Sequence, residues 1–250
     1  MAINYRSDEE IETMRAANQI VVAAHKHVQT LVRPGVKTIE LDAAAEEVIR
    51  DLGGRPSFKG YRGFPKTLCV AINSQVVHGI PDETELKDGD IIGLDLGVEH
   101  KGYYGDAAQT LPVGEISREA ERLLRVTREA LMKGIERVRP GGHLSDISHA
   151  VQTHAESAGY SVVTAFVGHG IGTSPHEDPQ VPNFGRPGRG PILRKGMVLA
   201  IEPMINMGSG DVEVLEDKWT VRTVDGSLSA HFEHSVAVTG DGYDILSSFG

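Results

Sequence analysis

A predicted β-hairpin carries two aspartates whose spacing suggests chemistry. Two apolar runs of strand length flank the turn-forming segment 99–102, a pattern that predicts a hairpin with a short loop. With the turn centred on His100 and Lys101, Asp95 is expected directly opposite Asp106 on one face of the strand pair. Carboxylates that project together repel each other unless a positive charge lies between them. A metal ion is the simplest such charge.

The surroundings of Asp95 help to choose between a metal site and two solvated aspartates, which the hairpin alone leaves equally open. The predicted strand around Asp95 contains four large apolar residues: Ile91, Ile92, Leu94 and Leu96. Such a continuous run is typical of a strand buried on both faces. Because an unpaired carboxylate is costly in those surroundings, the pattern favours the metal site.

The second half of the chain supplies further groups that could bind a metal. His169 lies within the segment 168–172, where glycine neighbours let a ligand come close. The spacing of these glycines does not match the G-x-G-x-x-G dinucleotide fingerprint. Taken singly, His169 is typical of an ordinary buried or loop histidine, and Glu202 and Glu233 of salt-bridge partners. Together with the hairpin aspartates they supply enough ligands for two metal ions that share carboxylates.

Two ions in such a ligand set favour hydrolysis. At the separation of about 3.5–4 Å used for this chemistry, they lower the pKa of a bound water from about 15.7 towards about 7 and polarise a carbonyl group. Cys69 is the only cysteine, so the chain can form neither an intrachain disulfide nor a Cys-based zinc finger. Ligands drawn from His and carboxylates suit Mn, Fe, Co or Zn.

Composition narrows the class of protein. The 250 residues carry a formal net charge of -10 and are 40% hydrophobic, which is ordinary for a globular chain with a substantial core. The acidic balance argues against a partner of duplex nucleic acid and against a polybasic membrane anchor. No apolar run approaches the roughly 18 residues of a membrane span, and the N-terminus lacks the apolar core of a signal peptide. We therefore expect a cytoplasmic protein.

Periodicity and turn residues predict four helices and several strands. The helices are expected from a capping box at Ser7 to a stop at Pro34, from a cap at Thr38 to Gly53, from Ser117 to Pro140, and over roughly 145–158. Besides the hairpin, strands are expected over 67–72, 75–78 and 162–167, the last leading into His169. Segment 185–191, rich in Gly, Pro and Arg, is expected to be a surface loop with no special role.

An internal repeat relates the two halves of the chain. The segment 32–35, Val-Arg-Pro-Gly, recurs as 138–141, and in each half it separates two predicted helices. The apolar strand 87–95 matches 194–202, with an acid in the same place at the end of each. We predict two α+β halves, roughly 7–112 and 117–250, that are related by a pseudo-twofold axis. Packed into one catalytic domain over 1–250, each half would supply acids to a shared site.

In the order of its motifs the sequence resembles type I methionine aminopeptidase, of the pita-bread fold. The motifs are Val77-His78-Gly79-Ile80-Pro81, Asp95, Gly105-Asp106, Gly168-His169-Gly170-Ile171-Gly172, Pro175-His176-Glu177, Ile201-Glu202-Pro203-Met204 and Phe232-Glu233-His234. They span nearly the whole chain. The resemblance implies an antiparallel sheet covered by helices on one side, in agreement with the repeat.

The resemblance also implies residue roles. Asp95, Asp106, His169, Glu202 and Glu233 would bind two divalent ions, with Asp106 and Glu233 bridging them. Glu202 would also be the general base towards the bridging water. His78 and His176 would contact the substrate amide and stabilise the tetrahedral intermediate. A bridging water or hydroxide would then attack the scissile carbonyl and release the initiator methionine from nascent proteins whose second residue is small.

A methionine pocket and a set of partners follow from the same resemblance. The expected pocket wall comprises Tyr61, Phe64, Cys69 and Trp219, and an aromatic slot suits an unbranched thioether side chain. Phe58 and Pro175 depart from the Cys and Phe that some members have there. The expected partners are the N-termini of nascent chains and, transiently, the ribosome. The protein itself is expected to be a monomer.

Two other functions are alternatives to methionine removal. A proline-specific peptidase of the same fold, such as prolidase or aminopeptidase P, usually carries an additional N-terminal domain, for which the residues before the first predicted strand are few. A binding module that kept the fold without catalysis would be expected to have lost at least one ligand. Retention of all five ligands argues against that module.

Overall fold

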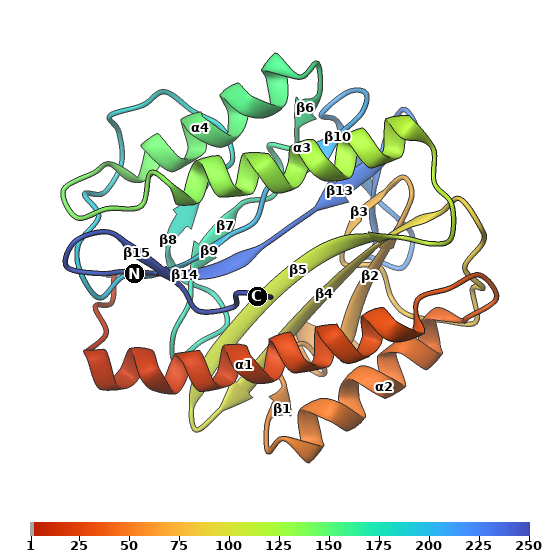
Figure 1. The fold of residues 1–250 in the computed structure, drawn as a ribbon, viewed down its shortest axis with the longest axis horizontal. Coiled ribbons are helices and arrows are strands. Elements are labelled where there is room, and N and C mark those ends of the chain that lie inside the picture. Colours follow the sequence, from red (N-terminus) through yellow and green to blue (C-terminus); the bar gives the residue numbers. More distant parts are fainter. Residues whose placement is uncertain (1–2) are drawn as a thin grey trace.

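The computed structural model describes residues 3–250, and in that range two pairs of helices pack against a set of antiparallel strands. Figure 1 shows one pair of helices in the lower half of the molecule and the other in the upper half, with the strands between and behind them. The helices are α1 (Asp8–Leu31), α2 (Thr38–Asp51), α3 (Arg118–Ile135) and α4 (Leu144–Ser157), with a short 3-10 turn, η1, at Tyr61–Gly63. Within the described range no helix combines the length and the apolar character needed to cross a membrane.

The strands form four sheets. They are β1 (Arg55–Pro56), β2 (Leu68–Ile72), β3 (Gln75–Val77), β4 (Ile91–His100), β5 (Tyr103–Pro112), β6 (Ser161–Val162), β7 (Gly168–Gly170), β8 (Glu177–Val181), β9 (Val198–Ile201), β10 (Met204–Asn206), β11 (Val212–Val214), β12 (Val221–Thr223), β13 (Ser229–His231), β14 (His234–Val238) and β15 (Tyr243–Ile245). One large sheet has β4 paired with β5, β1 and β2, and the other has the order β15-β14-β9-β7-β8. Smaller sheets have the orders β13-β10-β6 and β11-β12-β3. This α+β arrangement confirms the predicted fold class.

Side-chain hydrogen bonds fix where the first two helices begin. Ser7 caps α1 as predicted: its hydroxyl accepts from Glu10 N at 3.2 Å, and the Glu10 carboxylate accepts from Ser7 N at 2.8 Å. The prediction of Thr38 as the cap of α2 is wrong by one residue, because Lys37 occupies that position. The Thr38 hydroxyl instead donates to Asp82 O at 3.0 Å and ties the helix to the loop before β4.

The hairpin forms, but its predicted register is wrong by two residues. Lys101 and Gly102 make the turn, with φ values of 52° and 82°, as a two-residue turn with left-handed residues requires. Asp95 therefore pairs with Ala108, and Asp106 with Gly97. Because side chains alternate with a period of two, the shift leaves both aspartates on the same face of the sheet.

The two faces of the hairpin carry different kinds of side chain. The face that packs against α1 and α2 carries Leu94, Leu96 and Ala107 among its buried apolar residues. Asp95 and Asp106 occupy the opposite face. Covering one side of the sheet with helices thus leaves the other side free to build a site.

The second half differs from the sequence prediction near His169. The strand expected over 162–167 is limited to β6, which ends at Val162, because Thr164 and Ala165 are exposed and have no strand to pair with. His169 instead lies in the middle of β7, paired on one side with Gln180 of β8 and on the other with Ala200 of β9. Segment 185–191 is a surface loop as predicted, bonded to α4 through Gly188 N and the Asp146 carboxylate at 2.8 Å.

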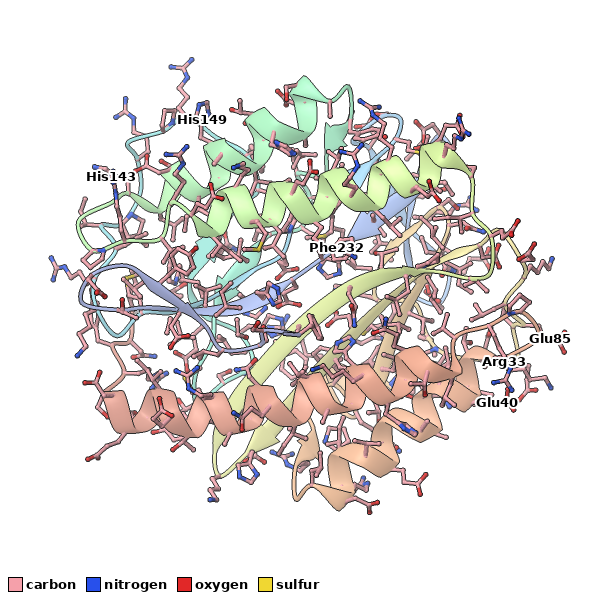
Figure 2. All side chains as sticks on the ribbon, in the orientation of Figure 1. Arg33, Glu40, Glu85, His143, His149 and Phe232 are labelled. Atoms are coloured by element: carbon pink, nitrogen blue, oxygen red, sulfur yellow. The ribbon has the colours of Figure 1, made fainter. Side chains whose placement is uncertain are left out.

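Equivalent hydrogen bonds recur in the two halves, as the repeat predicts. Gly35 N donates to Leu86 O at 2.8 Å, and Gly141 N donates to Leu193 O at 2.9 Å. Figure 2 shows Arg33, beside the first Pro-Gly break, and His143, beside the second, at opposite sides of the molecule. The Pro-Gly break therefore has the same role in each half, where it ends one helix and ties the next to the strand region.

Three residue pairs join β5 of the first half to segment 231–235 of the second, which runs from the end of β13 into β14. The Ser235 hydroxyl donates to Asp106 O at 2.8 Å and accepts from Asp106 N at 3.2 Å. Glu233 N donates to Ala108 O at 2.8 Å. The Thr110 hydroxyl accepts from His231 N and donates to His231 O, both at 2.9 Å. We call these contacts the seam, and they fix Asp106 and Glu233 relative to each other.

A buried histidine of α1 makes the stability of the protein depend on pH. His25 is fully buried and its Nε2–H donates to Ala107 O at 2.8 Å, while burial lowers the pKa of the ring to about 4. Since the unfolded chain takes up this proton below about pH 6.5 and the folded chain does not, stability falls as the pH drops from about 6.5 to about 4. When the pH is lowered from 7.5 to 4.5, we predict that the free energy of unfolding falls by about 2–3 kcal/mol less in His25→Gln than in the wild type. Urea unfolding of both proteins at each pH measures this difference.

The exposed His27 on the same helix provides the control for this comparison. His27→Gln should follow the wild-type pH dependence. Identical pH dependence in the His25 variant and the wild type would contradict the assignment.

Candidate active site

One pocket brings together residues from both halves. It has a volume of about 280 Å³ and lies on the face of the hairpin that carries Asp95 and Asp106. Its lining includes every residue that the sequence analysis selected for a site: Tyr61, Phe64, Cys69, His78, Asp95, Asp106, His169, His176, Glu202, Trp219 and Glu233. Two further residues, Phe58 and Arg62, complete the lining.

Four carboxyl groups converge at the base of this pocket. Asp106 and Glu233 are only 4% and 2% exposed, and candidate ligand atoms of Asp106, His169 and Glu233 all lie within 4.8 Å of one another. Asp95 comes from the neighbouring strand, and Glu202 follows the end of β9. No Lys or Arg forms an ion pair with any of these acids in the described part of the chain. Their mutual repulsion therefore lacks a protein counter-charge.

The imidazole of His169 faces the acids with a lone pair. Its Nδ1–H donates to Gly170 O at 3.0 Å, which leaves Nε2 unprotonated in the neutral ring. Nε2 lies 3.4 Å from Glu202 Oε1. Since a lone pair and a carboxylate oxygen repel each other, this arrangement suits a cation placed between them.

Electrostatics at the site fit a bound metal. Burial raises the pKa of Asp95 to about 7. Burial, reinforced by repulsion from neighbouring carboxylates, holds the pKa values of Asp106, Glu202 and Glu233 well above their usual range. One oxygen each of Asp95, Asp106 and Glu233 is buried with no hydrogen-bond partner among the described residues. Hard oxygen ligands with one imidazole are suitable donors for a divalent transition metal, so the residues present fit such an ion.

Two further histidines, His78 and His176, line the same pocket. His78 follows β3 with a φ of 62°, and burial lowers the pKa of its ring to about 4. His176 stacks on Tyr61 at a centroid distance of 5.3 Å, and its centroid is 4.3 Å from that of His169. Both rings can reach a molecule in the pocket, and the His78 ring would meet it in the neutral form.

Aromatic side chains form the apolar wall. Phe64 meets Trp219 edge-on at 5.2 Å, and both pack with Phe58 and Cys69 in one cluster. Phe58 fits because Gly97 lies beneath it: a Cβ at that position would come within 2.7 Å of the Phe58 ring. The wall is suited to a long apolar side chain and not to a charged one.

Three residues at or beside the pocket were not predicted from the sequence. Phe58, noted only as a departure, is part of the lining, whereas Pro175 is buried and is not. Arg62 lies at the mouth with a φ of 48° and its guanidinium 5.4 Å from the Tyr61 ring centroid, a position that nothing in its sequence neighbourhood indicates. His231 lies next to the pocket, with Nε2 3.7 Å from Glu202 Oε2; its proximity to Glu233 in the sequence was the available signal.

Both the sequence and the fold of this chain are similar to those of known proteins. Residues 12–240 match metallopeptidase family M24. The chain is 54% identical over 242 residues to the methionine aminopeptidase of Clostridium perfringens (strain 13 / Type A), covering 97% of each chain. Its fold matches the crystal structure of methionine aminopeptidase from Rickettsia prowazekii with a TM-score of 0.98 at 42% identity, covering 99% of this chain and 100% of that one. The prolidase from Pyrococcus horikoshii OT3, at 22% identity and a TM-score of 0.80, shares the fold, and this chain spans 63% of it.

Close packing of Phe58 on Gly97 yields a stability prediction. We expect Gly97→Ala to destabilise the protein by about 1–3 kcal/mol, because the new methyl group must displace Phe58 or Ser57. Gly240→Ala is the matched control, since a Cβ there meets nothing within 4 Å. Urea unfolding of both variants measures the difference, and equal stabilities would show that the pocket wall tolerates the shift.

Proposed function

This chain belongs to metallopeptidase family M24, and from that premise we propose that it removes the N-terminal methionine from newly made proteins. The observation that carries the proposal is the convergence of four largely buried acids and His169 beneath an apolar aromatic pocket. The acids supply a place for metal ions, and the wall supplies a place for the methionine side chain. The identity and coverage shared with methionine aminopeptidases support the same activity.

The metal would be held by Asp95, Asp106, His169, Glu202 and Glu233. We propose two divalent ions, of Co, Mn, Fe or Zn, shared through Asp106 and Glu233, which the seam holds close together. When bound, the ions supply an acidified water and an electrophilic contact for the scissile carbonyl. The unpartnered carboxylate oxygens at the base of the pocket support this assignment.

The protein groups around the reacting amide have distinct tasks in this proposal. Glu202 accepts the proton of the attacking water, because its carboxylate faces the pocket beside the other acids. His78 and His176, which both line the pocket, donate hydrogen bonds to the substrate amide and stabilise the tetrahedral intermediate. Their rings are held by aromatic neighbours, His78 by Phe166 at 5.6 Å and His176 by Tyr61.

The aromatic wall selects the first residue of the substrate. Tyr61, Phe64, Cys69 and Trp219, with Phe58 beside them, enclose a slot for an unbranched apolar side chain. The resemblance to type I methionine aminopeptidase implies that the second residue of the substrate is small. Specificity for methionine followed by a small residue is the expected consequence.

The same proposal assigns partners and a place in the cell. We propose a monomer that acts as a single catalytic domain over 1–250, with residues of both halves lining the one pocket. The substrates would be the N-termini of nascent chains, reached through transient contact with the ribosome. Such substrates arise in the cytoplasm, so we place the enzyme there.

Peptide hydrolysis distinguishes this function from its two alternatives. We predict that the protein, supplied with Mn²⁺ or Co²⁺, releases methionine from Met-Ala-Ser and leaves Ala-Pro-Ala intact, because the slot fits methionine. Chromatography of the products measures both reactions. Preferential cleavage of Ala-Pro-Ala would favour a proline-specific peptidase, and a folded protein that binds no metal and cleaves neither peptide would favour a binding module.

Replacement of one proposed ligand tests the metal site itself. We expect Asp106→Asn to lower turnover of Met-Ala-Ser by about 100-fold or more and to weaken metal binding, since the amide removes a negative ligand without changing side-chain size. The metal-free variant should unfold at a temperature no lower than the wild type, because one repelling carboxylate is gone. Elemental analysis and a peptidase assay provide the measurements.

Asp51→Asn at the exposed end of α2 serves as the control for charge removal. It should retain both metal and activity. Full activity in the Asp106 variant would rule out the proposed ligand set.

A further inference from the structure

His231 is buried beside Glu202 with an imidazole nitrogen that has no partner. The residue is 4% exposed, and its Nε2 makes no hydrogen bond among the described residues. That nitrogen lies 3.7 Å from Glu202 Oε2, while His169 Nε2 lies 3.4 Å from Glu202 Oε1. Each oxygen of the Glu202 carboxylate is therefore adjacent to a different imidazole.

The two imidazoles are placed differently with respect to the pocket. His169 lines it, whereas His231 does not. Glu202 itself lines the pocket, so His231 contacts the carboxylate from outside the cavity. From that position His231 can hold Glu202 without contacting a substrate.

The backbone of His231 is fixed from both neighbouring strands. Thr110 of β5 bonds both its N and its O at 2.9 Å through one hydroxyl. On the other side, His231 pairs with Met204, two residues beyond Glu202. The imidazole and the carboxylate are thus presented to each other by adjacent, hydrogen-bonded segments, and a shift of a few tenths of an ångström brings them to hydrogen-bond distance.

We propose that His231 is a positioning residue, whose Nε2–H donates to Glu202 Oε2 and orients the carboxylate. The donor would otherwise remain buried and unpaired, which is costly, so the bond is favourable for both groups. With Oε2 held, Oε1 is directed to the side of His169, with which it would hold the proposed metal. This inference rests on the proposed function, in which Glu202 is both ligand and base.

Three substitutions test the donor. His231→Leu removes it, His231→Gln keeps an amide donor of similar reach, and His231→Asn keeps a donor that is too short. Calorimetry of the metal-free proteins with Mn²⁺ measures affinity, and hydrolysis of Met-Ala-Ser at saturating Mn²⁺ gives kcat and KM. His149→Leu on α4 is the matched control, at the outer surface of the molecule away from Phe232, the neighbour of His231 (Figure 2).

We expect the Leu and Asn variants to bind Mn²⁺ about 10–100-fold more weakly and to lose a similar factor in kcat, with KM within about twofold of the wild type. His231→Gln and His149→Leu should stay within about threefold of the wild type in all three quantities. Unfolding temperatures verify that each variant is folded, and the Asn variant replaces the Leu variant if the latter fails to fold.

Two outcomes would overturn the proposal. Wild-type affinity and kcat in both the Leu and Asn variants would mean that His231 does not orient Glu202. A Gln variant as defective as the Leu variant would mean that the imidazole itself is required, as for a direct metal ligand. Should the wild type bind Mn²⁺ but fail to release methionine, the proposed function fails, and the Mn²⁺ affinities still decide the role of His231.

Discussion

Like-charge repulsion among four buried carboxyl groups is the constraint on which the rest of the structure depends. Asp95, Asp106, Glu202 and Glu233 lie at the base of one pocket, and no Lys or Arg forms an ion pair with them in residues 3–250. Desolvation raises the pKa values of all four groups, and repulsion from neighbouring carboxylates adds to the rise at Asp106, Glu202 and Glu233. A metal site of this kind therefore requires a fold that is stable enough to hold the four acids together.

The fold meets this constraint by giving helices and acids opposite sides of the strands. In the first half α1 and α2 pack on the face of the hairpin that carries Leu94, and Asp95 occupies the other face. The second half repeats the plan, and the seam joins the two through hydroxyl groups. Because Ser235 and Thr110 bond both backbone groups of their partners, the acids of one half are held at a fixed distance from those of the other. Rigid support of this kind is what a preorganised site requires.

Much of this arrangement is predictable from sequence, and the exceptions have physical reasons. Local signals placed the capping box at Ser7 and the Pro-Gly breaks, and motif order selected the pocket residues. The hairpin register was wrong because the turn requires left-handed φ at both central positions, which Gly102 adopts more readily than His100. Arg62 and His231 were missed because their importance comes from contacts between distant segments. A lone buried histidine gives the same local pattern whether it fills a core or supports a carboxylate.

The central claim is that the buried acids exist to hold metal ions. The most direct measurement is a crystal structure of the protein grown with Mn²⁺, with anomalous scattering used to locate the ions. The account predicts two manganese peaks in the pocket, within bonding distance of Asp95, Asp106, His169, Glu202 and Glu233. A pocket without manganese at saturating concentration, or peaks bound by other residues, would contradict it.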